Sequence, residues 1–322
     1  MAEQVNLFEN TENKKTIKHF MRSPLFYVGD KYKLMPQLTE LFPDKINNYF
    51  DVFCGGGSAS INVEAKVYNM NDIDENIIAL HYHLQRNSKN MYRFISRMYR
   101  LINSYGLSHS EKCIDERLEA YKKKYVKTYF ARYNKDSYLK LRRDFNRDNT
   151  NIDLLYLLLI YGFNHMIRFN NNGEFNLPVG NLDWNKNVTE SLLNYSSWSN
   201  NNKVHLHNMD FEEFVNSHVI NSDDFIYFDP PYLITFSDYN KLWSKEEELR
   251  LYNLLDSLDD RKVNWGISNM LSHKGKFNEI LYNWSKKYKV FEVKSNYISR
   301  FDNSIKKESR EVYITNYEKD RA

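Results

Sequence analysis

Residues 49–58 are Tyr49-Phe50-Asp51-Val52-Phe53-Cys54-Gly55-Gly56-Gly57-Ser58, and residues 67–72 are Val67-Tyr68-Asn69-Met70-Asn71-Asp72. Each segment contains a short run of apolar and aromatic residues, which is typical of a buried strand. A glycine turn follows the first run, and helical patterns follow both that turn and the second run. The order strand, helix, strand, helix predicts parallel strands in an α/β fold.

The rest of the chain divides into a helical part and a second set of strands. Helical periodicity dominates residues 86–199, including the apolar run at residues 153–163. We expect one sheet domain made of residues 1–85 and 200–322, interrupted by a mainly helical insertion at residues 86–199. Further strands of that sheet are predicted at residues 204–206, 225–228, 263–267, 290–293 and 311–315.

Positive charge is concentrated in one part of the insertion. Residues 86–147 hold 17 Lys and Arg against 6 Asp and Glu, whereas the whole chain carries a net charge of only +3. The remainder of the chain is therefore net acidic. This segregation suits a protein in which one part lies against a polyanion such as nucleic acid. A solvated helical face explains the same lysines equally well, so charge alone leaves both interpretations open.

The composition points to a reducing compartment. The chain has only two cysteines, Cys54 and Cys113, so no disulfide framework is expected. Residues 1–15 are polar and lack the apolar core of a signal peptide. The most apolar run, residues 154–163, is about half the length that a membrane span requires. We expect a cytoplasmic protein, bacterial or phage-encoded, without a membrane partner.

The glycine turn and Asp72 lie where an open α/β sheet binds ligands, at the carboxyl ends of two strands. Glycines let the backbone approach a ligand closely. A dinucleotide site or an ordinary tight turn is an alternative for the glycines alone. However, Ser60 or Ile61 stands where the last glycine of a dinucleotide fingerprint belongs. Asp72 is placed to accept hydrogen bonds from both hydroxyls of a ribose, and its alternative is a helix N-cap.

A second motif follows a continuous apolar strand. Phe225-Ile226-Tyr227-Phe228 runs directly into Asp229-Pro230-Pro231-Tyr232. The two prolines end the strand because neither donates to a ladder. The Asp229 carboxylate and the Pro230 carbonyl are then paired acceptors, which match the two N–H bonds of an aromatic amine, and Tyr232 offers a stacking face. The alternative is a tight turn that only closes the strand.

Taken together, these residues resemble the DNA adenine methyltransferase (Dam) family, the D12 class of N6-adenine methyltransferases, over residues 23–317. The resemblance rests on four segments that occur in the family's order. They are Pro24-Leu25-Phe26-Tyr27-Val28-Gly29-Asp30-Lys31, the glycine turn with Asp72, Asn164-His165-Met166-Ile167-Arg168 leading to Gly173-Glu174-Phe175-Asn176-Leu177-Pro178-Val179-Gly180, and Asp229-Pro230-Pro231-Tyr232.

The resemblance implies a Rossmann-like sheet of the S-adenosylmethionine-dependent methyltransferases with a helical target-recognition insertion. It implies methylation of the N6 amine of an adenine flipped out of duplex DNA, with S-adenosylmethionine as the methyl donor and no metal ion. Residues 311–316 resemble the family's last sheet strand, so we expect a complete catalytic domain. The resemblance also implies the catalytic residues, which are Asp229, Pro230, Pro231 and Tyr232. The cofactor-binding residues are Tyr27, Lys31, Asp51, Phe53, Gly55, Gly57, Asp72 and Asp229.

The same resemblance places the DNA contacts in the insertion. The expected DNA-binding residues are Phe163, Asn164, Met166, Arg168 and Pro178. An arginine donates a forked pair of hydrogen bonds to guanine, and an aromatic ring can fill the space left by a flipped base. Three positions differ from the pattern of enzymes that recognise GATC, which makes that target doubtful. Those positions are Phe26, where the family lysine contacts the first guanine, and Asn181 and Leu182.

Three other functions compete with adenine methylation. An N4-cytosine methyltransferase presents the same paired acceptors to the same kind of amine. A DNA-binding regulator with a vestigial cofactor site is a second alternative, and the retention of Lys31, Asp72 and Asp229 disfavours it. An oxidoreductase is disfavoured by the glycine spacing. A functional pairing with a restriction endonuclease is compatible with the sequence but not indicated by any residue.

Overall fold

A computed structural model describes residues 19–112, 116–235, 243–294 and 309–318. Its centre is a mostly parallel sheet in the strand order β3-β2-β1-β4-β5-β8-β7. Strands β1 to β5 pair parallel with one another, and β8 pairs antiparallel with both β5 and β7. The strands are β1 (Asn48–Asp51), β2 (Val67–Asn71), β3 (Lys203–His207), β4 (Phe225–Phe228), β5 (Asn264–His273), β7 (Lys289–Val293) and β8 (Arg310–Thr315).

The strand order reverses between β1 and β4. From β1 the chain moves outward to β2 and β3, then returns to form β4 on the other side of β1. The two strands pair in register, with Asp51 opposite Tyr227. In an open α/β sheet, the carboxyl ends of the strands at such a reversal form the ligand-binding crevice. The glycine turn after β1 and the tetrapeptide after β4 therefore meet at one place.

Helices cover both faces of the sheet, so its central strands β1, β4 and β5 are largely buried on both sides. Phe50 and Ile226 belong to a core beneath α8 (Phe211–Asn216), α9 (Lys245–Asp260) and α10 (Glu279–Ser285). Their neighbours Tyr49 and Tyr227 point to the opposite core. That core also contains buried residues of α1 (Met35–Leu41), α2 (Glu75–Ser88) and α7 (Lys186–Asn201). The alternation follows from the two-residue period of a strand.

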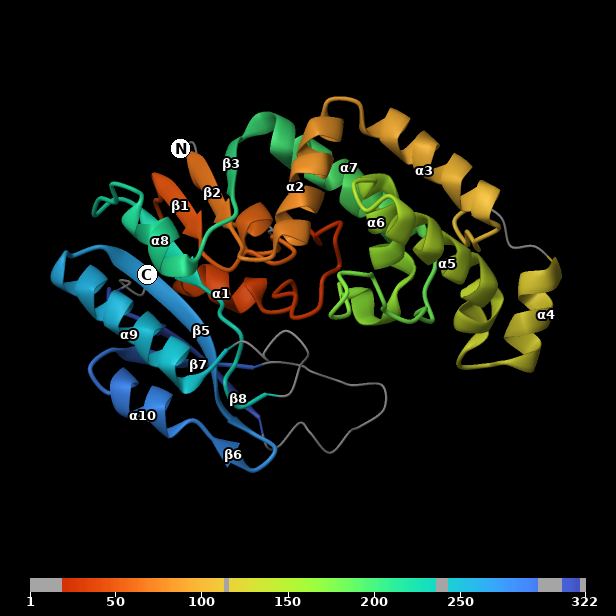
Figure 1. The fold of residues 1–322 in the computed structure, drawn as a ribbon. Coiled ribbons are helices and arrows are strands. Elements are labelled where there is room, and N and C mark those ends of the chain that lie inside the picture. Colours follow the sequence, from red (N-terminus) through yellow and green to blue (C-terminus); the bar gives the residue numbers. More distant parts are fainter. Residues whose placement is uncertain (1–18, 113–115, 236–242, 295–308, 319–322) are drawn as a thin grey trace, which may run out of the picture.

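The predicted helical insertion lies between β2 and β3 and extends to one side of the sheet, with α4 at its far end (Figure 1). Residues 154–161 are buried all round, so α6 is the central helix of this part. Within the described residues of the insertion, strand-like pairing occurs only as isolated bridges, such as Gly162 with Val179. Besides α2 and α7, the elements are α3 (Met91–Tyr105), α4 (Glu116–Lys124), α5 (Tyr129–Arg147), α6 (Ile152–Tyr161) and the 3₁₀ turn η2 (Phe163–His165).

The predicted α/β class and strand positions are confirmed, with differences at the edges. The boundary expected at residue 85 falls inside α2, which packs against β3 and α7. Strand β5 continues six residues beyond the predicted end, because β8 and the two-residue strand β6 (Lys276–Phe277) pair along its length. No helix in the described part of the chain is both long and apolar enough to cross a membrane.

Candidate active site

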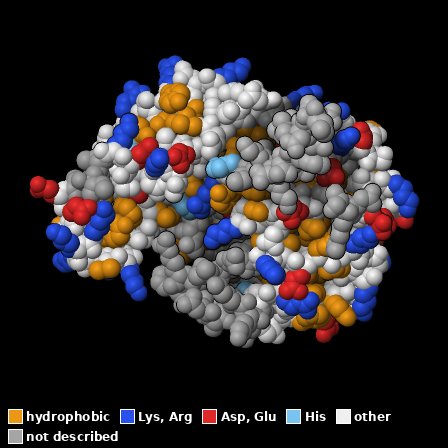
Figure 2. Space-filling model, turned by 180° about the vertical axis from the view of Figure 1, so that it is seen from behind, with side chains coloured by type: hydrophobic (Ala, Val, Ile, Leu, Met, Phe, Trp, Pro, Cys, Tyr) orange, Lys and Arg blue, Asp and Glu red, His pale blue; other side chains and the backbone are white. Residues whose placement is uncertain are grey.

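A cavity of about 880 Å³ opens at the carboxyl ends of the central strands. The space-filling view shows a hollow near the middle of the molecule, with hydrophobic, Lys and Arg side chains around it (Figure 2). Most of the predicted cofactor-binding and catalytic residues lie in its wall. They are Tyr27, Lys31, Asp51, Phe53, Gly55, Asp72, Asp229, Pro230, Pro231 and Tyr232.

Two glycines of the turn, Gly56 and Gly57, leave little room for a side chain. A Cβ atom at Gly56 would lie 3.1 Å from Cβ of Tyr27, so Tyr27 covers the turn directly. Gly57 is absent from the cavity wall described above. Its φ of +77° favours glycine, and a Cβ atom there would lie 2.7 Å from Cε of Met70 and 3.0 Å from the ring of His81. Gly57 therefore lets the turn pack against β2 and α2.

Asp72 is held by backbone groups at the end of β2. Its Oδ2 accepts a hydrogen bond from Gly55 N–H at 2.9 Å, and its Oδ1 accepts one from Asp74 N–H at 3.0 Å. Burial raises the pKa of Asp72 to about 6, against the opposing effect of these hydrogen bonds. The helix N-cap is Asp74, whose carboxylate accepts a hydrogen bond from Asn76 N–H. The N-cap interpretation of Asp72 is therefore wrong.

Asp51 is oriented inside the turn. Ser60, at the position where a dinucleotide site has glycine, donates a 2.6 Å hydrogen bond to Asp51 Oδ2. Burial, together with the nearby carboxylates of Asp229 and Asp72, raises the pKa of Asp51 to about 7, although the Ser60 hydrogen bond opposes this shift. Asp51, Asp72 and Asp229 thus lie in the wall of the same cavity, a setting that favours a ligand carrying positive charge.

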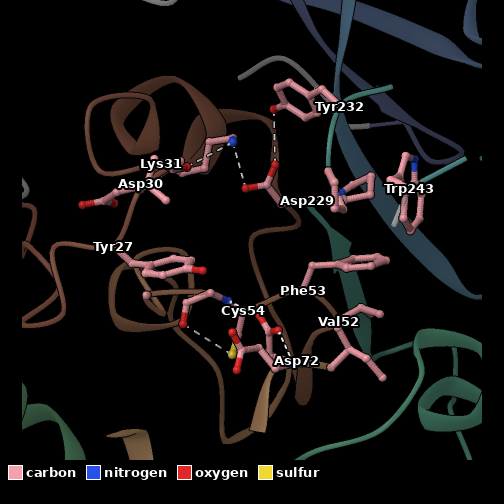
Figure 3. A pocket seen from close by; sticks show the side chains of 18 of the residues that line it. Tyr27, Asp30, Lys31, Val52, Phe53, Cys54, Asp72, Asp229, Tyr232 and Trp243 are labelled. Atoms are coloured by element: carbon pink, nitrogen blue, oxygen red, sulfur yellow. Dashed lines mark hydrogen bonds and ion pairs between the residues drawn. The ribbon is translucent and has the colours of Figure 1, made fainter. Parts of the chain in front are cut away.

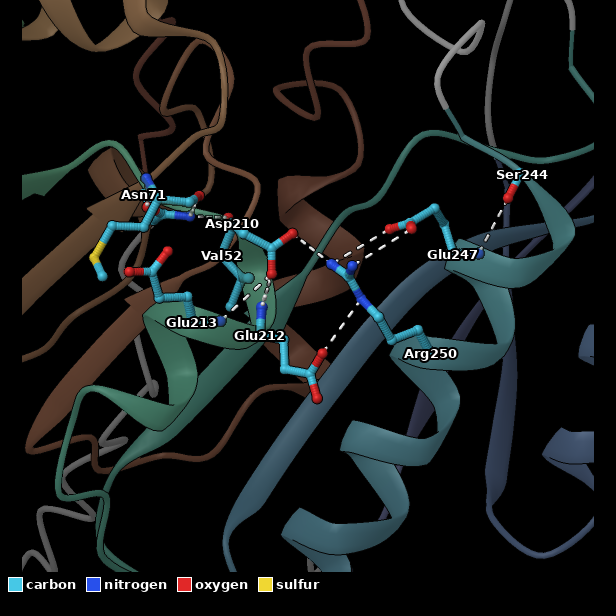
Figure 4. Close-up of polar contacts among 9 residues, drawn as sticks. Val52, Asn71, Asp210, Glu212, Glu213, Ser244, Glu247 and Arg250 are labelled. Atoms are coloured by element: carbon cyan, nitrogen blue, oxygen red, sulfur yellow. Dashed lines mark hydrogen bonds and ion pairs between the residues drawn. The ribbon is translucent and has the colours of Figure 1, made fainter.

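The side chain of Asn71 joins three segments at the wall of the cavity (Figure 4). Its side-chain amide donates to the carbonyl oxygens of Val52 at 3.1 Å and Met209 at 3.0 Å. Its carbonyl oxygen accepts from Met209 N–H at 3.0 Å. The ends of β1 and β2 are thereby tied to the segment that follows β3. This buried side chain sets the spacing between the glycine turn and Asp72.

An ion-pair cluster ties α8 to α9 beside the cavity (Figure 4). The Arg250 guanidinium pairs with Asp210, the N-cap of α8, and lies 3.3 Å from carboxylate oxygens of Glu212 and Glu247. The guanidinium also lies 4.2 Å from the ring centroid of Phe211. Asp210, Phe211 and Glu247 line the cavity, so the cluster holds one of its walls.

Three aromatic rings form an apolar corner of the cavity. The ring centroid of Phe53 lies 5.6 Å from that of Phe211 and 5.6 Å from that of Trp243. Phe211 and Trp243 are 5.9 Å apart. Figure 3 shows Phe53 and Trp243 on the same side of the cavity. This corner suits a planar, uncharged ring.

A cluster of charged residues forms another part of the cavity wall, in the upper part of Figure 3. Lys31 Nζ lies 2.8 Å from Asp229 Oδ2 and 3.8 Å from Glu311 Oε1. The Tyr232 hydroxyl lies 3.2 Å from Asp229 Oδ1 and 2.7 Å from Glu311 Oε1. Burial raises the pKa of Asp229, and the adjacent Lys31 opposes that shift. The cluster places three parts of the chain in direct contact: the tetrapeptide, the segment at residues 24–31 and β8.

The predicted DNA-binding residues lie on two adjoining segments. Phe163 N–H donates to the Pro178 carbonyl at 3.0 Å, which brings the segments together. Phe163 is 50% exposed, and Asn164 and Pro178 are also exposed. Met166 and Arg168 line the cavity.

Arg168 is already engaged within this segment, which the sequence did not predict. Its Nε donates to Asn176 Oδ1 at 2.8 Å, and its Nη2 donates to the Asn176 carbonyl at 3.0 Å. These bonds orient the guanidinium at the cavity wall. Nearby, the ring of His165 packs 5.4 Å from that of Phe26, and its Nδ1 lies 3.1 Å from the Leu159 carbonyl.

Four residues of the site were missed at the sequence level: Asn71, Asp210, Trp243 and Glu311. The rule that ligands meet strand carboxyl ends would have found two of them, because Asn71 ends β2 and Asp210 follows β3 closely. Glu311 carried another signal. A glutamate within an otherwise apolar strand is expected to be exposed or paired. Trp243 carried no comparable signal.

Comparison with known proteins agrees with this arrangement. The family model of the D12 class N6 adenine-specific DNA methyltransferases matches residues 27–298. This chain belongs to that family. The matched range contains Lys31, Asp72 and Asp229, which all line the cavity described above.

Among its relatives, the chain is 34% identical over 94% of its length to the Type II methyltransferase M.FokI of Planomicrobium okeanokoites. It is 33% identical over 96% of its length to Modification methylase StsI of Streptococcus sanguinis. It covers only 44% and 45% of those two proteins, so it spans less than half of their length. It is 25% identical to the DNA adenine methylase of Haemophilus influenzae, over 85% of this chain and 86% of that protein.

Proposed function

We propose that this D12-class chain transfers a methyl group from S-adenosylmethionine to the N6 amine of adenine at a specific sequence in duplex DNA. The observation that carries the proposal is the position of Asp229-Pro230-Pro231-Tyr232. The tetrapeptide ends β4 beside the strand-order reversal, with Asp229 paired to the buried Lys31 and facing the same cavity as Asp72.

The residues of the cavity fit the parts of S-adenosylmethionine. Asp72 is the acceptor for the ribose hydroxyls, and the corner of Phe53, Phe211 and Trp243 takes the adenine ring. Asp51 and Asp229 give the cavity negative charge, which suits the sulfonium. Asp210, at the edge of the aromatic corner, adds a polar contact for the adenine edge. The bound cofactor supplies an electrophilic methyl group on that sulfonium.

The chain's own residues prepare the target amine. The Asp229 carboxylate and the Pro230 carbonyl accept hydrogen bonds from the two N–H groups of the amine. These hydrogen bonds raise the electron density on the nitrogen. Lys31 favours the ionised form of Asp229, the form that accepts a hydrogen bond. Lys31 Nζ lies 5.0 Å from the ring centroid of Tyr232, so we place the flipped base on the other face of that ring. No strong base is required, because the amine loses its proton after the methyl group arrives.

We propose that residues 86–199 are the target-recognition domain. Phe163, Asn164 and Pro178 lie exposed on adjoining segments, and Met166 and Arg168 extend this surface into the cavity. Some of the basic residues have structural roles instead. Arg97 lies 2.6 Å from the Asp153 carboxylate and joins α3 to α6. Exposed lysines of α4 and the following turn, such as Lys123, Lys124 and Lys127, remain candidates for phosphate contacts.

The relatives named Type II methyltransferase and Modification methylase support a role in protecting DNA from a partner restriction endonuclease. The biochemical proposal can be tested with the chain alone. Purified protein, methyl-labelled S-adenosylmethionine and duplex DNA of mixed sequence should yield labelled N6-methyldeoxyadenosine when the DNA is digested to nucleosides. Label only in N4-methyldeoxycytidine would reject adenine as the target.

Asp72→Ala is expected to weaken S-adenosylmethionine binding by about tenfold to a hundredfold, because a hydrogen bond to a buried charged group contributes about 1.5–3 kcal/mol. Calorimetry on the folded variant measures this loss. Asp74→Ala is the matched comparison. It should remove the N-cap of α2, at a stability cost of about 1 kcal/mol, and change cofactor affinity much less. Equal effects of the two substitutions would reject Asp72 as the ribose ligand.

Cofactor affinity should also depend on pH. The pKa of Asp72 is raised to about 6, so lowering the pH through 6 neutralises the carboxylate that accepts the ribose hydroxyls. Wild-type affinity should therefore fall below pH 6. The Asp72→Ala variant should lack that part of the pH dependence, and an unchanged profile would contradict the assignment.

Arg168→Ala is expected to reduce discrimination at one guanine-containing base pair by about 1–3 kcal/mol, because a forked contact to guanine exists only when that base is present. A triple variant with Ala at Lys123, Lys124 and Lys127 should instead weaken binding to all duplexes alike. Its DNA affinity should also depend less steeply on salt concentration. Binding to a panel of single-base variants at several salt concentrations separates the two. Uniform weakening by Arg168→Ala would place recognition elsewhere.

A further inference from the structure

The Tyr232 hydroxyl lies between two carboxylates. Its oxygen is 2.7 Å from Glu311 Oε1 and 3.2 Å from Asp229 Oδ1. A phenol has one hydrogen, so it donates a full hydrogen bond to only one of these oxygens at a time. The shorter distance favours Glu311 as the acceptor.

Glu311 is well placed to keep that hydrogen. It lies in β8 with no exposed surface, so bulk water does not compete for its oxygen. Lys31 Nζ lies 3.8 Å from the same Oε1 atom, so a positive charge stands beside this acceptor. An ionised acceptor makes the stronger hydrogen bond.

The two oxygens of Asp229 are thereby given different partners. Oδ2 faces Lys31 Nζ at 2.8 Å, whereas Oδ1 faces the tyrosine oxygen at the longer distance. If the hydroxyl hydrogen points to Glu311, Asp229 Oδ1 stays able to accept a hydrogen bond from an N–H group of the target amine. If the hydrogen turned to Asp229, it would compete with the target amine for that oxygen.

We propose that Glu311 is a positioning residue that takes the Tyr232 hydroxyl hydrogen and so reserves Asp229 Oδ1 for the target amine. The inference rests on the proposed methyl transfer for its consequence, but the direction of the hydroxyl is a property of the protein alone. It predicts that Glu311 acts on catalysis through the Tyr232 hydroxyl.

Four enzymes test this coupling: wild type, Glu311→Gln, Tyr232→Phe and the double variant. Glutamine keeps the shape of Glu311 and removes its charge, so the hydroxyl should turn to the ionised Asp229. We expect Glu311→Gln to lower kcat about tenfold in the wild-type background, with KM for DNA and cofactor affinity changed less than about twofold. In the Tyr232→Phe background, where no hydroxyl competes, Glu311→Gln should change kcat by less than about twofold. The same fold-loss in both backgrounds, or no loss in either, would overturn the proposal.

A second readout needs no turnover and no Glu311 variant. In the full chain without DNA or cofactor, carboxyl ¹³C chemical shifts report which carboxylate accepts the hydroxyl hydrogen. Tyr232→Phe should shift the Glu311 resonance more than the Asp229 resonance. The reverse order would overturn the inference even in an active enzyme. If the wild type methylates no adenine while Glu311 shows the larger shift, the proposed function fails and the hydroxyl direction stands.

Discussion

Asp229→Ala is expected to lower methyl transfer by about a hundredfold or more. The substitution removes one of the two acceptors on the target amine, and loss of one such preorganised group commonly costs at least that factor. Single-turnover measurements with saturating cofactor and DNA give the rate of the transfer step directly. Turnover within a few-fold of wild type would reject the role assigned to the tetrapeptide.

The variant should remain folded and should bind duplex DNA. Without Asp229, Lys31 still has the Glu311 carboxylate at 3.8 Å, so the buried ammonium keeps a counter-ion. Asp223→Ala is a suitable control, because Asp223 is an exposed carboxylate beside the other end of β4. It should retain wild-type turnover. A comparable loss in that control would indicate damage to the strand instead of loss of an acceptor.

Lys31→Met is expected to lower the free energy of unfolding by about 3–5 kcal/mol near pH 8. The substitution leaves two carboxylates, the partly buried Asp229 and the buried Glu311, without their shared cation, and removing one partner of a buried ion pair carries a penalty of this size. Urea unfolding of both proteins measures the difference. Lys33→Met, at an exposed position two residues away, should have little effect.

The sign of the pH dependence distinguishes this mechanism from a simple packing defect. Burial already raises the pKa of Asp229, and loss of Lys31 should raise it further. A carboxyl group with a raised pKa binds its proton more tightly in the folded state, so the variant should regain stability relative to wild type as the pH falls from 8 towards 5. A deficit independent of pH would contradict the electrostatic explanation.

The sequence predicted those parts of the site that local pattern determines. Asp72 and Asp229 each follow a buried strand, and parallel strands bring their carboxyl ends together at one edge of the sheet. The glycine turn was found for the same reason. Gly57 was placed in the right turn, but its tight packing against Met70 depends on residues outside the motif.

The remaining contacts join residues that are far apart in the chain. Glu311 and Tyr232 are 79 residues apart, and Arg250 and Asp210 are 40 apart. The strand pattern at residues 311–315 includes Glu311, but such a pattern cannot pair a residue with a partner on another element. The boundary expected at residue 85 falls inside α2 for a related reason. The helical pattern of α2 does not reveal that the helix packs on the sheet, which depends on its contacts with β3 and α7.

The most direct test of the central claim is to express this chain in a host that lacks DNA methylation and to sequence the host DNA with modified bases called. We expect N6-methyladenine at every copy of one short sequence, and no such mark in cells expressing Asp229→Ala. Methylation confined to cytosine, or unmodified DNA from cells that contain folded wild-type protein, would contradict it.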